Sequence, residues 1–120
     1  MHDQALSSGF HSTAVGGESV ASATGAQAFG WQSRATGVTS VSVGHQAAAS
    51  GVSASAIGKN TIASGARSTA IGFGAAATAD DQVVLGGTGS SVRIGDITAS
   101  TAAQTAASVG AATVDANGVL

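Results

Sequence analysis

The sequence is poor in the residues from which an ordinary globular core is built. Its 120 residues include three Phe, one Trp, no Tyr and no Cys. So few large side chains cannot fill the centre of a conventional domain of this length. The lack of cysteine also excludes a disulfide framework and a thiolate metal site.

Charge is equally sparse. Six acidic residues and four Lys or Arg residues give a formal net charge of -2, and they are scattered along the chain. No basic stripe is present for nucleic acid or an anionic membrane, so neither partner is expected. No run approaches the ~20 apolar residues of a membrane span. Met1-His2-Asp3 lacks the features of a secretory signal, so we expect a fragment without signal or anchor.

Glycine, in contrast, recurs at a fixed interval. It occupies every seventh position from Gly9 to Gly86, with only Ala23 and Ala79 interrupting the series. A fixed period predicts stacked structural repeats in place of one central core. Glycine this frequent weakens helices, and an interior of Ala, Ser and Thr must be narrow. The pattern therefore predicts a thin β-coil, with function on its surface.

The repeat unit is fourteen residues long. Six double heptads align without a gap from Asp3 to Gly86, and the third and fifth positions of each heptad are almost always Ala, Ser or Thr. These two positions share one face of a strand, as Ser33 and Ala35 illustrate. We expect two short strands per unit with glycine at the bends, and small side chains lining an interior too thin for a cavity.

The sixth position of each heptad is predicted to face outward, and there the two halves of the unit differ. The second half carries an apolar row: Val15, Phe29, Val43, Ile57, Ile71 and Leu85. The first half carries a hydroxyl row: Ser8, Ser22, Thr36, Ser50, Ser64 and Thr78. Because contiguous apolar surface marks an interface, and a periodic row matches itself, the pattern predicts a homo-oligomer of parallel coils.

Three segments carry a family resemblance: Thr36 to Gly44, Ser53 to Gly58 and Ala63 to Gly72. They resemble the head repeats of trimeric autotransporter adhesins of the Yersinia adhesin type, over Asp3 to Gly86. The resemblance implies an all-β, left-handed parallel β-roll that is homotrimeric, with the apolar row as trimer interface. It also implies a bacterial outer-membrane protein whose extracellular part is displayed at the cell surface.

The segment after the repeats resembles the neck of the same family, where the chain crosses toward a neighbouring subunit. The implied neck residues are Val92, Arg93, Ile94 and Ile97. Necks of the family tend to carry Arg, a spacer and then Ile-x-Asn-Val. Here Arg93 directly precedes Ile94 without a spacer, and Asp96-Ile97 stands in place of Asn-Val, so the match departs from the family pattern. The predicted organisation is a head at 1–86, a neck-like segment at 87–97 and an Ala/Thr-rich extension at 98–120, whose structure the sequence leaves undecided.

No chemistry-bearing constellation stands out. His2, His11 and His45 do not have metal-ligand spacing, and no Ser-His-Asp or Cys-His arrangement is implied. The late glycines lack the Gly-Lys-Ser of a phosphate loop. We therefore expect no catalytic, cofactor-binding or metal-binding residue. Trp31 and Phe73, at the bends, either anchor a partner or pack across neighbouring coils, and the second interpretation is favoured.

The favoured hypothesis is a structural adhesin head, not an enzyme, that attaches to extracellular matrix proteins, surfaces or other cells. The alternative is a phage tail-fibre or other trimeric β-roll fibre segment. A less favoured one is an ice-binding face on the hydroxyl row. A hexapeptide-repeat acyltransferase is disfavoured because the period is seven and fourteen, not six.

Overall fold

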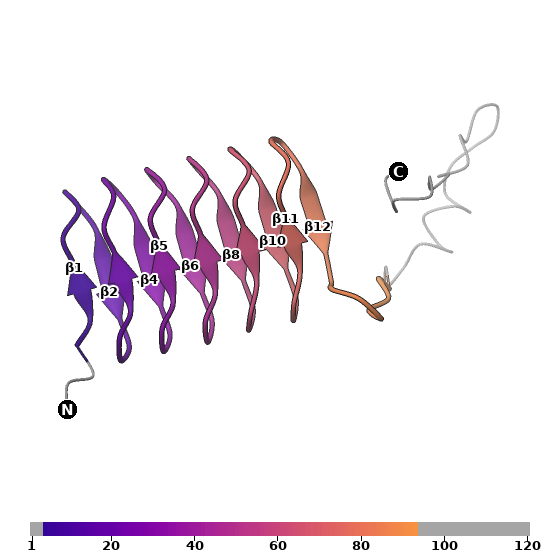
Figure 1. The fold of residues 1–120 in the computed structure, drawn as a ribbon, viewed down its shortest axis with the longest axis horizontal. Coiled ribbons are helices and arrows are strands. Elements are labelled where there is room, and N and C mark those ends of the chain that lie inside the picture. The colour runs from indigo at the N-terminus through magenta and orange to yellow at the C-terminus, as the bar shows by residue number, and fades with distance from the viewer. Residues whose placement is uncertain (1–3, 94–120) are drawn as a thin grey trace, which may run out of the picture.

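The computed structural model describes residues 4–93, and these form an all-β solenoid of stacked coils (Figure 1). Each coil contributes one two-residue strand and one three-residue strand. The twelve strands are β1 (Leu6–Ser7), β2 (Thr13–Val15), β3 (Val20–Ala21), β4 (Gln27–Phe29), β5 (Arg34–Ala35), β6 (Val41–Val43), β7 (Ala48–Ala49), β8 (Ser55–Ile57), β9 (Ile62–Ala63), β10 (Thr69–Ile71), β11 (Ala76–Ala77) and β12 (Val83–Leu85).

All strand pairs are parallel, and each strand pairs with the one fourteen residues further along, as Leu6 with Val20 and Thr13 with Gln27 show. The odd-numbered strands form one six-stranded sheet, here called sheet A, and the even-numbered strands form a second, sheet B. The fourteen-residue coil predicted from the glycine period is therefore confirmed. Equivalent positions of successive coils lie directly beside one another.

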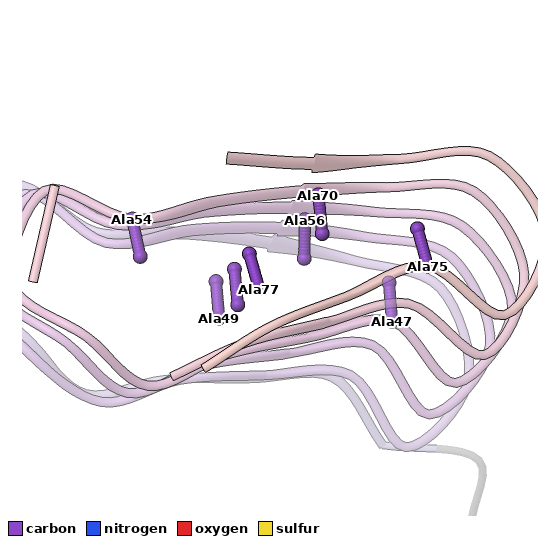
Figure 2. Close-up of a cluster of buried hydrophobic side chains, with 8 residues drawn as sticks. Ala47, Ala49, Ala54, Ala56, Ala70, Ala75 and Ala77 are labelled. Carbon is purple, nitrogen blue, oxygen red and sulfur yellow. The ribbon is translucent and has the colours of Figure 1, made fainter. Parts of the chain in front are cut away.

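The core lies between the two sheets and consists of small side chains. Among residues 4–93 every fully buried side chain other than glycine occupies a third or fifth heptad position, as predicted. Figure 2 shows eight of the alanines converging from the two sheets. The buried residues are Ser19, Ala21, Ala26, Ala28, Ser33, Ala35, Ser40, Ser42, Ala47, Ala49, Ala54, Ala56, Thr61, Ala63, Ser68, Ala70, Ala75 and Ala77.

Most of the buried hydroxyls have backbone partners. Ser19 Oγ donates to the Gly16 carbonyl at 2.7 Å, and Ser42 Oγ donates to the Ala47 carbonyl at 2.8 Å. Such bonds offset the cost of removing a hydroxyl from water. Ser33 Oγ and Ser40 Oγ are buried without a partner. The coil that contains both residues is therefore the least well satisfied part of the interior.

The bends have a repeated left-handed residue that the sequence analysis did not predict. Every seventh residue from 11 to 81, two positions after the heptad glycine or its alanine replacement, has a positive φ. Most of these residues are not glycine: Arg67 has a φ of 56° and Thr39 a φ of 54°. Because such residues rarely adopt this conformation, the stacked coils must impose it.

The heptad glycines are required by close contact between coils. Gly44 has a φ of +132°, and a Cβ added there would lie 2.6 Å from the Gly58 carbonyl oxygen of the next coil. Gly37 has no unusual φ, but its added Cβ would overlap the Gly51 carbonyl oxygen. The period of seven thus records where the backbones of neighbouring coils touch.

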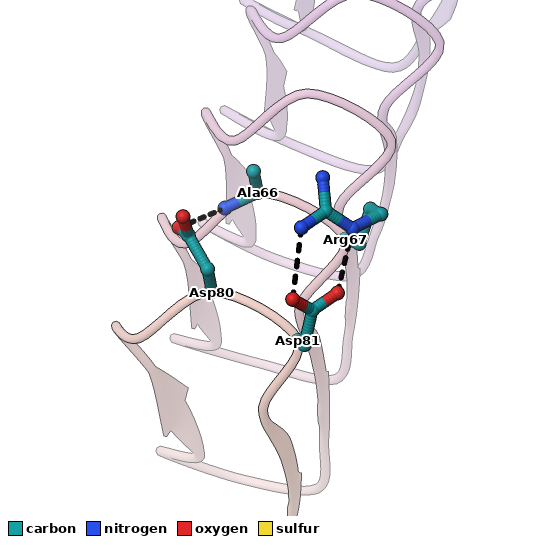
Figure 3. A network of polar contacts seen from close by, with 4 residues as sticks. All are labelled: Ala66, Arg67, Asp80 and Asp81. Carbon is teal, nitrogen blue, oxygen red and sulfur yellow. Dashed lines mark hydrogen bonds and ion pairs between the residues drawn. The ribbon is translucent and has the colours of Figure 1, made fainter.

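Side chains of the sixth coil (residues 73–86) form hydrogen bonds and an ion pair with the fifth coil (residues 59–72) (Figure 3). Arg67 donates two hydrogen bonds to the Asp81 carboxylate, at 2.6 and 2.8 Å, and the Ala66 amide donates to Asp80 Oδ1 at 2.9 Å. Gln82 occupies an interior position, and its Oε1 accepts from the backbone amides of Thr78 and Ala79. The contacts made by Asp80 and Gln82 satisfy backbone amides at that end of the solenoid.

Candidate interaction surfaces

The apolar row runs along the outer side of sheet B. Register pairs Val43 with Ile57, Ile57 with Ile71, and Ile71 with Leu85, so the side chains follow one another at the strand spacing of about 4.8 Å. Leu85 is 51% exposed, and Ile57 and Ile71 are each 40% exposed. The single chain thus leaves a continuous line of aliphatic groups in water.

The same face carries the fourth-position residues, which the sequence analysis did not consider. They are Thr13, Gln27, Val41, Ser55, Thr69 and Val83, one on each strand of sheet B. Val83, at 65% exposure, widens the apolar surface at the last coil. Alternation along each three-residue strand would have identified this second column.

The two bend aromatics behave differently. Trp31 packs on His45 of the next coil, with ring centroids 4.6 Å apart, in agreement with the favoured packing across coils. Phe73 is 67% exposed. At the opposite set of bends, His11 stacks on Phe10 with ring centroids 4.0 Å apart.

The hydroxyl row lies on the outer side of sheet A, and all six of its residues are exposed. The adjacent fourth-position column is mixed: Leu6 and Ile62 are exposed aliphatic residues, and Arg34 is charged. The face is therefore less uniformly polar than the sixth position alone predicts. A regular hydroxyl plane, as an ice-binding face would need, is interrupted by these neighbours.

A polar depression lies at the bends that lead from sheet B to sheet A. It has a volume of about 360 Å³ and is lined by Glu18, Gln32, Arg34 and Gln46. Gln46 Nε2 donates to Gln32 Oε1 at 2.9 Å, and Gln32 Nε2 donates to the Glu18 carboxylate. Three successive coils thus supply one connected line of side chains. Their fourteen-residue spacing in the sequence is the signal that would have found it.

The Arg67–Asp81 ion pair is exposed to solvent. Hydrogen bonds from Arg67 are the main cause that lowers the pKa of the Asp81 carboxyl below its ordinary value, and the same bonds raise the pKa of Arg67. Within residues 4–93, no group of three His, Cys, Asp or Glu side chains is placed to hold a metal ion. That part of the chain also contains no helix long and apolar enough to cross a membrane.

The predicted neck falls largely beyond these surfaces. Val92 and Arg93 are exposed and belong to no strand. Ile94, Ile97 and the extension at 98–120 lie outside the described residues. The neck and the three-part division of the chain therefore stay predictions.

Comparison with known protein families gives one finding that bears on these surfaces. The family model described as YadA head domain repeat (2 copies) matches residues 7–33, 35–61, 49–75 and 63–81, together more than half of the chain. Comparison with curated proteins and with solved structures gives no match. The matched residues are those of the solenoid coils.

Proposed function

The chain belongs to the YadA head domain repeat family, and we propose that it is the head module of a homotrimeric adhesin displayed at the bacterial cell surface. In this role the module is structural: three left-handed rolls form a rigid unit whose outer faces meet matrix proteins, surfaces or other cells. Membership of the YadA head domain repeat family supports this role. Attachment to matrix proteins, surfaces or other cells is what we propose in addition.

The exposed apolar row carries the trimer part of the proposal. Parallel coils arranged around a shared axis bring the same residue of each chain to the same level, so a row with one residue per coil meets its own copies. Covering side chains that are 37% to 54% exposed, as Val43 and Val15 are, removes apolar surface from water and stabilises the assembly.

The proposed adhesive role depends on the surface that remains exposed on such a trimer. Sheet A and its hydroxyl row lie opposite the apolar row on each chain. Three copies repeat that surface around the axis, so weak contacts to a repetitive target gain strength through multivalency. A rigid multivalent surface suits attachment better than binding of one small substrate.

Attachment is tested with beads that carry the folded chain. We expect them to adhere to at least one of three surfaces: immobilised matrix protein, untreated plastic, or a layer of beads carrying the same chain. Beads carrying heat-unfolded chain are the control, because they present the same residues without the repeat geometry. Equal attachment of folded and unfolded beads to all three surfaces would contradict the adhesive role.

A further inference from the structure

The polar depression is separate from the apolar row. The row lies on sheet B, whereas Arg34 belongs to β5 of sheet A, and Glu18, Gln32 and Gln46 lie at the bends between the sheets. An assembly held through the apolar row therefore does not use these four side chains as its central contact. In the single chain Glu18, Arg34 and Gln46 are exposed to solvent, and Gln32 is partly exposed.

Arg34 brings unused hydrogen-bonding capacity to the depression. The side chain is exposed and has no hydrogen bond or ion pair with any residue in 4–93. A guanidinium offers five N–H donors in a planar fork, which matches the two oxygens of a carboxylate. Arg34 thus supplies an anion-binding group at one side of the depression.

The two glutamines add a different capacity, because their side-chain amides both donate and accept hydrogen bonds, whereas a guanidinium only donates. Their amides are held in line by the bonds from Gln46 to Gln32 and from Gln32 to Glu18. Each amide keeps further donor or acceptor capacity, because an amide has two N–H donors and two oxygen lone pairs. Groups held in place before binding lose little conformational freedom when a ligand arrives.

We propose that this depression binds a carboxylate-bearing sugar residue of a glycan or polysaccharide. The sugar carboxylate pairs with the Arg34 guanidinium, and its hydroxyls exchange hydrogen bonds with the amides of Gln32 and Gln46. Sugar hydroxyls donate and accept at once, as the amides do. A peptide can also offer a carboxylate and backbone amides, but a sugar acid carries its carboxylate and several hydroxyls on one ring, so a single residue can reach Arg34 and the glutamine amides together.

The test is a titration of the folded ¹⁵N-labelled chain with a tetrasaccharide that contains glucuronate. We expect saturable shifts of the Gln32 and Gln46 side-chain amide signals. Arg34→Gln should weaken binding at least about tenfold. Arg67→Gln is the matched control, since it also removes one guanidinium but at the bends that lead from sheet A to sheet B, and it should bind as the unchanged chain does.

Two further ligands identify what is recognised. A neutral glucose tetrasaccharide should bind at least about tenfold more weakly than the glucuronate compound, and so should a tetraglutamate peptide. Equal affinity for either ligand, or equal loss in the Arg34→Gln and Arg67→Gln variants, would overturn the inference. Light scattering on the same samples separates it from the proposed function. Three chains per particle without saccharide binding would overturn the sugar site alone.

Discussion

Placing two aspartates in the apolar row should disrupt the assembly. In the double variant Ile57→Asp, Ile71→Asp each chain loses two side chains that are 40% exposed when the chain is alone. Covering the exposed part of each contributes roughly 1 kcal/mol, a fraction of the 1.5–3 kcal/mol for complete burial. Leaving a polar group without partners in an apolar interface costs at least about 2 kcal/mol, and a carboxylate costs more.

Over the two positions these contributions sum to at least about 6 kcal/mol per chain, which corresponds to a factor of more than about ten thousand in an association constant. Thermal unfolding followed by circular dichroism should therefore show a large decrease in the melting temperature at micromolar concentration. The control is Ser50→Asp, Ser64→Asp, which places the same charges in the same two coils but on the hydroxyl row. Equal melting temperatures for the two double variants would refute the assignment of the interface.

Three other changes probe the solenoid itself. Ser40→Ala should stabilise the chain by about 1 kcal/mol because it removes a buried hydroxyl without a partner. Ser42→Ala should not stabilise it, since Ser42 donates a hydrogen bond to a backbone carbonyl. Equal urea unfolding midpoints for the two variants would contradict this. Gly44→Ala should prevent native stacking of the coils, because the added Cβ would overlap the Gly58 carbonyl oxygen. Gly74→Ala, with no atom near the added Cβ, should cost only about 1–2 kcal/mol of backbone strain. A soluble, native-like Gly44→Ala protein would be the contrary result. The lowered pKa of Asp81 means that its contribution to stability is present above the unfolded value of about 3.9 and is lost as pH falls through the folded value. Asp81→Asn should therefore flatten the stability profile below about pH 4, and unchanged acid sensitivity of that variant would argue against the ion pair.

The interior was predictable because its rule is local and repeated. Two small residues per heptad, such as Ser33 and Ala35, alternate with larger outward residues, and strand geometry alone assigns them to one face. The glycine period likewise predicted the coil length, because touching backbones leave no room for a side chain at positions such as Gly44.

The left-handed bend residues were not predictable in the same way. Gly25 and Gly74 fall at this position, but Thr39 and Arg67 have the same positive φ without any local preference for it. The conformation there is imposed by stacking on the coils above and below, so tertiary contacts override the residue's own tendency.

The polar depression required the register between coils. Glu18, Gln32 and Gln46 are fourteen residues apart, and the parallel pairing converts that interval into direct contact. Arg34 joins them because it is the fourth residue of its heptad, on β5, and faces outward next to the bend. Counting charges along the chain shows only that Arg34 is one of four scattered basic residues, because the sequence does not show which side chains share a bend.

We propose that the apolar row holds identical chains together. Light scattering of the purified chain over a concentration series measures this directly. We expect a particle of three chains that persists on dilution until the coils unfold. A folded single chain at micromolar concentration would contradict it, because the row on sheet B would then remain stably exposed to water.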